Sequence, residues 1–314
     1  MRAVAVNHFG ELPEVVEVMT PTADPGQVLV RLAAASINPM DAKVASGEWR
    51  PAPAVFPMVL GVDGAGYVEA TGEGETKFAR GDKVFGQLFI PPIGSTGTYA
   101  EYVAVSAEAP LTCVPDGLDL VLAASAPTAG GTGLSLVDLL DPVQDQAVLL
   151  IGAGGGVGTF ASQFAVNAGA SVIANINAED VDRMRSYGVS ETVVRSDMSL
   201  TDAVRASHSD GVDVLIDLVS DATAFARTSA LVRPGGVAIT TQYVADLEAL
   251  RSSGVRGVNF ALRMTSDLIA RVGQALVEDS VQPPPISRIT LEDVPAMFRS
   301  RNRSRRGCKT VIIL

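Results

Sequence analysis

The chain contains 314 residues, of which 47% are hydrophobic and 19% charged, so it is long enough for two domains and too apolar to be disordered. Its formal net charge of −11 argues against nucleic acid or an anionic membrane as a partner, because both bind basic surfaces. Two cysteines cannot form a disulfide framework. The sequence shows neither an N-terminal signal nor an apolar run of membrane-spanning length, so we expect a cytoplasmic protein.

Residues 1–120 have the texture of an antiparallel, barrel-like domain. Proline and glycine separate short apolar runs, as expected for strands that are joined by turns. These runs lie at residues 1–6, 27–32, 66–69, 83–85 and 100–103.

Residues 121–258 alternate between short apolar runs and helical patterns, which is typical of a parallel sheet covered on both faces. The expected strands lie at residues 148–151, 170–174, 191–194, 212–216 and 236–240. Residues 259–314 change to one helix, a proline break and a final strand at 310–314, preceded by a basic run at 299–306 that we interpret as a solvated loop. We therefore expect a mixed α/β chain in which residues 121–258 are inserted into a second domain, formed by residues 1–120 and 259–314.

A glycine-rich turn follows the expected strand at 148–151 and leads into a helix. Such a turn lets the backbone approach a dinucleotide pyrophosphate, which the free N–H groups at the helix start then bind. The best register on the Gly-x-Gly-x-x-Gly template is Ala153, Gly155 and Gly158, so alanine replaces the first glycine. Gly156 and Val157 complete the expected pyrophosphate contacts.

The end of the second strand of this domain indicates which dinucleotide is bound. An acidic residue about 20 positions after the glycine motif would bind the ribose hydroxyls of NAD, but Asn175 and Asn177 stand there. Arg183 and Arg195 follow, and a guanidinium pairs well with a 2′-phosphate, which a carboxylate would repel. This pattern predicts NADPH, with solvated surface arginines as the alternative interpretation.

Five motifs support a resemblance to a known family. They are Ala35-Ser-Ile-Asn-Pro-Met-Asp41 with Lys43, Leu60-Gly-Val-Asp-Gly-Ala-Gly66, Ala79-Arg-Gly-Asp-Lys-Val-Phe-Gly86, Gly97-Thr-Tyr-Ala-Glu-Tyr102 and Gly152-Ala-Gly-Gly-Gly-Val-Gly158. Together they resemble the medium-chain dehydrogenase/reductase superfamily, and within it the zinc-free quinone oxidoreductase and enoyl reductase branch. The resemblance covers the whole chain and implies a GroES-like β-barrel catalytic domain with an inserted Rossmann dinucleotide-binding domain.

The resemblance also implies that the catalytic metal of the zinc alcohol dehydrogenases is absent. The positions of their zinc ligands fall on Asn38, Val62 and Thr128, and a valine cannot ligate zinc. Without a metal, an alkoxide is difficult to stabilise, whereas hydrogen bonds alone can stabilise an enolate or phenolate. We therefore expect no metal site, and hydride transfer to a quinone or an activated C=C bond.

By resemblance, Asn38 contacts substrate or cofactor beside the nicotinamide, with Asp41 and Lys43 close by as further catalytic residues. The alternative is that Asn38 and the proline after it cap a helix, while Asp41 and Lys43 pair at its exposed start.

Four further cofactor contacts are implied by the resemblance. Thr132 matches the threonine that touches the nicotinamide, with a simple helix-start threonine as the alternative. Asp217 and Val219 resemble the rim around the adenine ribose, and Thr240 ends a strand that faces the nicotinamide.

The sequence thus predicts an NADPH-dependent reductase that acts on a small-molecule quinone or enone. Two alternatives stay open: a dedicated enoyl reductase of a specialised-metabolite pathway, and an NADPH-binding homologue without catalysis. Because relatives in the superfamily pair the edge strands of their nucleotide domains, we also expect a homodimer.

Overall fold

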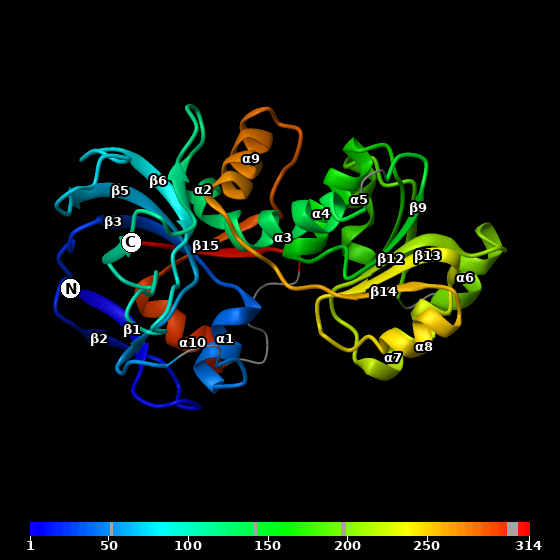
Figure 1. Cartoon of the computed structure of the whole chain (residues 1–314), viewed down its shortest axis with the longest axis horizontal. Helices are drawn as coiled ribbons and strands as arrows, with labels where there is room; N and C mark the ends of the chain where they lie inside the picture. The colour runs from blue at the N-terminus through cyan, green and yellow to red at the C-terminus, as the bar shows by residue number, and fades with distance from the viewer. Residues whose placement is uncertain (51–52, 141–142, 196–198, 300–306) are drawn as a thin grey trace. The chain divides into compact units, whose positions relative to one another are not determined.

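The computed structural model describes residues 1–50, 53–140, 143–195, 199–299 and 307–314 (Figure 1). The chain forms two compact units. The first unit comprises Met1–Gly131, Met264–Asp279 and Pro283–Leu314, and the second comprises Thr132–Arg263 and Ser280–Gln282. The division therefore falls later than the expected boundaries at residues 120 and 258. Most of the basic run interpreted as a loop, residues 300–306, lies outside the described residues.

The first unit is mainly antiparallel and carries the strands expected in residues 1–120. Its strands are β1 (Arg2–Val6), β2 (Glu14–Glu17), β3 (Gln27–Ser36), β4 (Met58–Val59), β5 (Asp63–Thr71), β6 (Lys83–Gln87), β7 (Tyr102–Ser106), β8 (Leu111–Cys113), β15 (Ile286–Thr290) and β16 (Lys309–Ile313). They form a three-stranded sheet in the order β2-β1-β4 and a seven-stranded sheet in the order β15-β16-β3-β5-β6-β8, with β7 paired to β3. Each expected run overlaps a strand.

Helices α1 (Pro39–Ser46), α2 (Leu120–Ser125), α9 (Ser266–Val277) and α10 (Val294–Arg299) belong to this unit, with the short turn η2 (Leu291–Asp293). Helix α2 contacts β3 and β5, and α9 contacts β8. The C-terminal strand β16 pairs antiparallel with β3, so that Val311 faces Ser36 across the ladder. The C-terminal strand therefore lies within the sheet of the first unit, between β15 and β3, and Lys309 lies beside the loop that follows β3.

The second unit is built on a six-stranded parallel sheet, in the order β11-β10-β9-β12-β13-β14. The strands are β9 (Ala147–Ile151), β10 (Ser171–Ile176), β11 (Glu191–Val194), β12 (Val212–Asp217), β13 (Val232–Thr240) and β14 (Arg256–Asn259). The strands expected from the sequence are confirmed. From β9 the chain adds strands first on one side, β10 and β11, and then on the other side, β12 to β14. The carboxyl ends of β9 and β12 therefore form a topological switch point, the place where open α/β sheets bind ligands.

Helices cover both faces of this parallel sheet, as the pattern of buried strands predicts. They are α4 (Gly156–Asn167), α5 (Val181–Ser186), α6 (Leu200–Ser207), α7 (Ala222–Ser229) and α8 (Leu247–Ser252), with the short turn η1 (Ala178–Asp180); α3 (Pro127–Asp138) runs from the first unit into the second. Figure 1 shows α4 and α5 on one side of the sheet and α6, α7 and α8 on the other.

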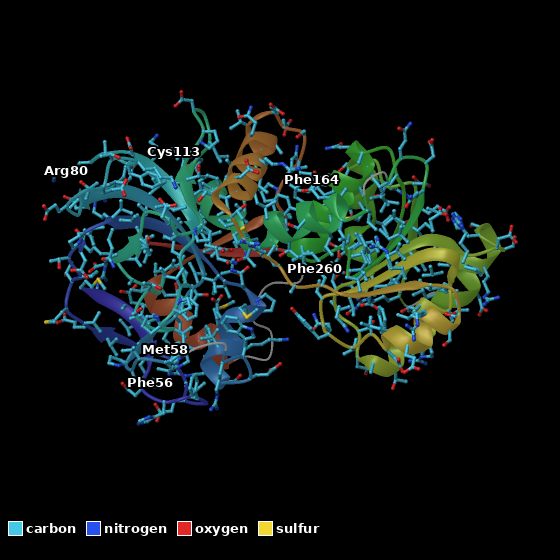
Figure 2. The ribbon with its side chains drawn as sticks, viewed as in Figure 1. Phe56, Met58, Arg80, Cys113, Phe164 and Phe260 are labelled. Carbon is cyan, nitrogen blue, oxygen red and sulfur yellow. The ribbon has the colours of Figure 1, made fainter. Side chains whose placement is uncertain are left out.

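Side chains alternate between the two faces of the sheet. Leu149 and Leu215 point into a core that includes Phe225 of α7 and Leu250 of α8. On α4, Phe164, labelled in Figure 2, stacks on Phe160, with their ring centroids 6.3 Å apart.

In the described part of the chain, no helix has both the length and the apolar character needed to cross a membrane.

Candidate functional site

The glycine turn between β9 and α4 has the geometry of a phosphate cradle. Gly152 takes a φ of 84°, which favours glycine, and its carbonyl accepts a hydrogen bond from the Gly155 N–H at 3.1 Å. A Cβ on Gly158 would collide with the carbonyl of Gly152 and with the backbone of Ala153, so only glycine fits there. The turn that requires glycine thus begins at Gly152, one residue before the first position of the predicted register.

The two sides of this turn differ in exposure. Ala153 and Gly158 are buried against the protein, whereas Gly155 is exposed and Gly156 and Val157 are half-buried. Gly155 caps the 12-residue helix α4, whose first N–H groups have no acceptor within the helix. Exposed backbone donors at the positive end of a helix suit a pyrophosphate, so the residues present fit a dinucleotide.

Arg183 on α5 lies against this turn. Its Nη1 donates to Thr159 Oγ1 at 2.8 Å, and its Nη2 donates to the Gly154 carbonyl at 3.0 Å and pairs with Asp180. The side chain is 15% exposed. The sequence predicts that Arg183 binds a 2′-phosphate. In the structure, its guanidinium is instead bound to groups of the protein.

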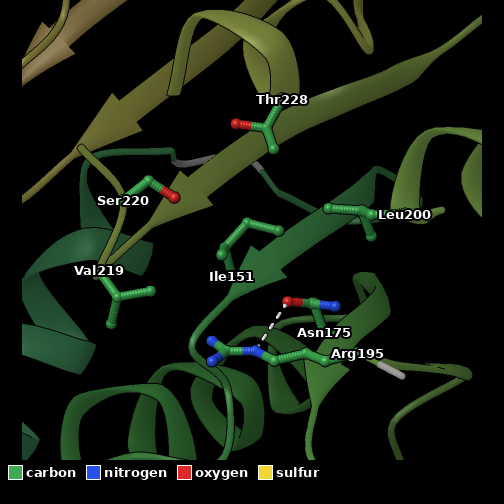
Figure 3. A pocket seen from close by; sticks show the side chains of 7 residues that line it. All are labelled: Ile151, Asn175, Arg195, Leu200, Val219, Ser220 and Thr228. Atoms are coloured by element: carbon green, nitrogen blue, oxygen red, sulfur yellow. Dashed lines mark hydrogen bonds between the residues drawn. The ribbon is translucent and has the colours of Figure 1, made fainter. Parts of the chain in front are cut away.

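A pocket of about 390 Å³ opens at the carboxyl ends of the parallel strands (Figure 3). Its lining residues are Ile151, Asn175, Arg195, Leu200, Val219, Ser220 and Thr228. Arg195 is exposed and its Nε donates to Asn175 Oδ1 at 3.4 Å, while the Asn175 Nδ2 donates to the Val193 carbonyl at 3.2 Å. Among the described residues, those lining the pocket include one cation and no carboxylate, which favours an anionic ligand group.

Asp217, at the end of β12, shapes the rim of this pocket rather than entering it. The carboxylate is buried, and its Oδ1 accepts hydrogen bonds from the backbone N–H groups of Val219 at 3.1 Å and Ser220 at 2.9 Å. Val219 is thereby held at the pocket with 56% of its surface exposed. A carboxylate that is occupied by backbone donors is a positioning group for this loop.

The three other expected cofactor contacts lie in the second unit but do not line this pocket. Thr240, at the end of β13, is buried and its Oγ1 accepts a hydrogen bond from the Gln242 N–H at 3.0 Å. Asn177 precedes η1, and its carbonyl accepts from the Asp180 N–H at 3.1 Å. Thr132 is buried within α3.

The first unit contains a buried polar cluster around Asn38, which directly precedes α1. The Asn38 amide donates from Nδ2 to Asp63 Oδ2 at 3.0 Å and accepts at Oδ1 from Lys309 Nζ at 2.5 Å. The Thr128 hydroxyl donates to the other carboxylate oxygen, Asp63 Oδ1, at 2.6 Å. Burial raises the pKa of Asp63 and lowers that of Lys309, while their opposite charges counter both shifts. Asn38, Asp63 and Thr128 thus form one connected array with Lys309.

Asp41 belongs to the same cluster. Its Oδ2 accepts hydrogen bonds from the Asn38 N–H at 2.6 Å and from the Tyr99 hydroxyl at 2.7 Å, and its Oδ1 is buried without a partner in the described structure. Burial raises the pKa of Asp41 to about 7, against the lowering effect of these two hydrogen bonds. The Asp41 carboxyl therefore changes between its protonated and ionised forms close to neutral pH.

Lys43 lies apart from the cluster. Its Nζ is 3.5 Å from Glu48 Oε1, and both side chains are at least 40% exposed. The alternative interpretation, in which Asp41 and Lys43 pair at an exposed helix start, is therefore wrong for the pair, although Asn38 does occupy the N-cap of α1.

Three members of the cluster were missed in the sequence. Asp63 and Tyr99 lie in motifs that carried the family resemblance, and Lys309 is the first residue of the final strand. A charged residue in an otherwise apolar strand was the available signal. In the described ranges, no three or more His, Cys, Asp or Glu side chains are grouped as a metal site would need.

Comparisons with known proteins agree with this fold. The alcohol dehydrogenase GroES-like domain family matches residues 24–116, and the zinc-binding dehydrogenase family matches residues 156–261. A quinone oxidoreductase from Sus scrofa is 31% identical over 228 residues, which cover 70% of this chain and 67% of that protein.

Two further similarities concern a solved structure and a polyketide synthase component. The structure of a quinone oxidoreductase from Coxiella burnetii superposes with a TM-score of 0.88 at 25% identity, covering 100% of this chain and 99% of that one. The pikromycin polyketide synthase component PikAII from Streptomyces venezuelae is 34% identical over 217 residues, which cover 68% of this chain and 5% of that protein.

Proposed function

The chain belongs to the medium-chain dehydrogenase/reductase superfamily, in its quinone oxidoreductase branch, and from this premise we propose that it is a zinc-independent NADPH-dependent reductase. Its acceptor is a quinone or the β-carbon of an α,β-unsaturated carbonyl compound. NADPH, when bound, supplies the hydride. The acceptor gains that hydride and one proton, and the nicotinamide is oxidised.

The pocket at the carboxyl ends of β9 to β12 carries the proposal for NADPH. Arg195 is exposed there and is held through Nε by Asn175, which leaves the far end of its planar fork for a ligand. A guanidinium binds a phosphate with two parallel hydrogen bonds, and the lining residues that the structure describes include no carboxylate that would repel a phosphate. A ribose 2′-phosphate is the dinucleotide group that differs between NADPH and NADH, so this pocket is where we place it.

The glycine turn supports the same proposal for the rest of the dinucleotide. The N–H groups of Gly156 and Val157, at the start of α4, would hold the pyrophosphate, because they lie at the positive end of the helix. Gly158 keeps the helix close to the turn, since no Cβ fits at that position. Thr132 and Thr240 stay proposed contacts of the nicotinamide half.

The polar cluster of the first unit is the proposed source of catalytic groups. Burial raises the pKa of Asp41 to about 7, although its Oδ2 accepts hydrogen bonds from the Asn38 N–H and the Tyr99 hydroxyl, so this carboxyl is the candidate proton donor. We propose that this carboxyl supplies the proton that the reduced acceptor takes up. The Asn38 side-chain amide is occupied by Lys309, Asp63 and the Ser36 carbonyl. The proposed role of Asn38 is therefore to orient Asp41 through its backbone N–H. No contact connects Lys43 to this cluster in the described structure.

A second candidate is a dedicated enoyl reductase of a specialised-metabolite pathway. The similarity to a polyketide synthase component over 68% of this chain favours it. Such an enzyme would use the same cofactor site but accept a defined thioester-linked enoyl group instead of generic quinones.

Turnover separates these candidates. The purified protein would be mixed with NADPH or NADH and with a benzoquinone, a naphthoquinone, a linear enone, a 2-alkenal or an enoyl thioester, and oxidation of the reduced nicotinamide followed by absorbance. Turnover of a quinone or a free enone supports the proposal, and turnover of the thioester alone supports the second candidate. Nucleotide binding without turnover of any acceptor would contradict both.

A further inference from the structure

We propose that Arg183 is a positioning residue of the dinucleotide site, which fixes the glycine turn and neutralises a carboxylate beside it. Arg183 would therefore support binding of the pyrophosphate that NADH and NADPH share, and would take no part in choosing between them. This inference rests on the proposed function only in so far as a dinucleotide occupies the turn.

The contacts of Arg183 connect three separate segments. Its guanidinium, carried on α5, donates to the carbonyl of Gly154 in the turn at 3.0 Å and to Thr159 in the first turns of α4 at 2.8 Å. It also pairs with Asp180 at the end of η1. One rigid, planar group thus fixes the position of the turn relative to the helix whose N–H groups would bind phosphate.

Asp180 explains why a cation is needed at this place. Its side chain is 5% exposed, and its carboxylate lies so close to Gly154 that a Cβ on that glycine would collide with Oδ2. A negative charge therefore lies directly against the backbone of the turn. Without a partner it would be costly to bury and would repel an incoming pyrophosphate. Arg183 removes both effects, because it supplies the opposite charge and a hydrogen bond.

The geometry also distinguishes Arg183 from Arg195. Arg183 is 15% exposed and its fork is directed to acceptors of the protein, whereas Arg195 is exposed and lines the pocket. The two arginines, which the sequence groups as readers of one phosphate, therefore have different roles.

Binding measurements with the full-length protein test this assignment. Dissociation constants for NADPH and NADH would be measured by calorimetry for the wild type, R183A, R183K, the double variant D180N/R183A and the control R185A. Arg185 lies on the same helix and is exposed, so its removal reports the loss of a surface charge alone.

We expect R183A to weaken NADPH and NADH binding by the same factor, roughly tenfold, because the fixed turn and the neutralised carboxylate serve both nucleotides. R183K should recover part of the loss, since a lysine restores the charge but not the fork. D180N/R183A should bind better than R183A because the repelling carboxylate is gone. R185A should match the wild type.

Two results would overturn the inference. A loss in R183A that is confined to NADPH would make Arg183 a reader of the 2′-phosphate, and unchanged binding of both nucleotides would reduce it to a purely structural contact. If R183A does not fold, the comparison of R183K with the wild type still decides between shared and NADPH-specific loss. A wild-type protein that binds neither nucleotide would instead refute the proposed function.

Discussion

Lys309 in the C-terminal strand donates a hydrogen bond from Nζ to Asn38 Oδ1 at 2.5 Å, across 271 positions of the sequence. The same ammonium group donates to the Ile37 carbonyl at 3.1 Å and lies in the field of two buried carboxylates, Asp63 and Asp41. The last strand of the chain therefore supplies a positive charge that compensates the acids of the polar cluster described above.

Replacing this lysine tests that compensation. K309M should lower the free energy of unfolding by roughly 3 kcal/mol or more, because it leaves a buried acid uncompensated and an amide oxygen without its donor. Urea unfolding measures the loss. K43M, which removes an exposed lysine paired with Glu48, should change stability by about 0.5 kcal/mol or less. Similar stability of K309M and K43M would contradict the role given to Lys309.

The pKa of Asp41, raised to about 7, predicts a dependence of stability on pH. The folded protein binds this proton more tightly than the unfolded chain, whose ordinary value is 3.8. This contribution to stability is therefore complete below the unfolded pKa and is lost as pH rises through about 7, to an extent on the order of 4 kcal/mol.

D41N isolates that contribution, because an amide cannot titrate and its oxygen can still accept from Tyr99 and the Asn38 N–H. The unfolding free energy of D41N minus that of the wild type should increase between about pH 5 and about pH 8. Urea unfolding at a series of pH values gives this difference. A difference that stays constant over the range would show that Asp41 is ionised throughout.

Tyr99 should shift the same titration. Its hydroxyl donates to Asp41 Oδ2 at 2.7 Å and lowers the pKa of Asp41, so Y99F should raise that pKa further. The pH at which stability falls should therefore move upward, with a loss of about 1–2 kcal/mol at high pH. Y102F, on the half-buried Tyr102 of β7, is the matched control. An unshifted midpoint in Y99F would exclude this hydrogen bond as a determinant.

Gly158 and Gly155 should respond differently to alanine. A Cβ at Gly158 would collide with the backbone of the preceding turn, so G158A should lower the unfolding free energy by roughly 1–3 kcal/mol. At Gly155 the nearest atom is the Gly152 carbonyl oxygen, 3.4 Å from an added Cβ, so G155A should fold almost unchanged. Thermal unfolding measures the stability of both variants. Equal losses of stability in G158A and G155A would refute the close approach at Gly158.

Most of the fold could be predicted because it depends on local patterns. The buried strands β9 to β13 are short apolar runs with glycines near their ends, and such runs are recognisable in the sequence alone. The first unit includes α2 and the start of α3, and α2 packs on β3 and β5, although the sequence pattern of both helices resembles that of the second unit. Helical pattern alone does not say against which sheet a helix packs.

The site was predictable where chemistry follows from adjacent residues, and not where it depends on the fold. The glycine turn is contiguous, so its position was evident. The pairs Lys309 with Asn38 and Tyr99 with Asp41 are 271 and 58 positions apart, and one sequence does not indicate that they meet. The direction of Arg183 depends on the rotation of α5, which places its guanidinium on the turn instead of in the pocket.

The dissociation constants of NADPH and NADH for R195A test the central claim most directly. Removing the guanidinium should weaken NADPH binding by about 2 kcal/mol, or roughly 30-fold, because its phosphate loses a bidentate partner, and should leave NADH binding nearly unchanged. R195K, which keeps the charge without the fork, should lie between R195A and the wild type. Equal losses for both nucleotides, or a wild type that binds NADH as tightly as NADPH, would contradict NADPH as the cofactor of this reductase.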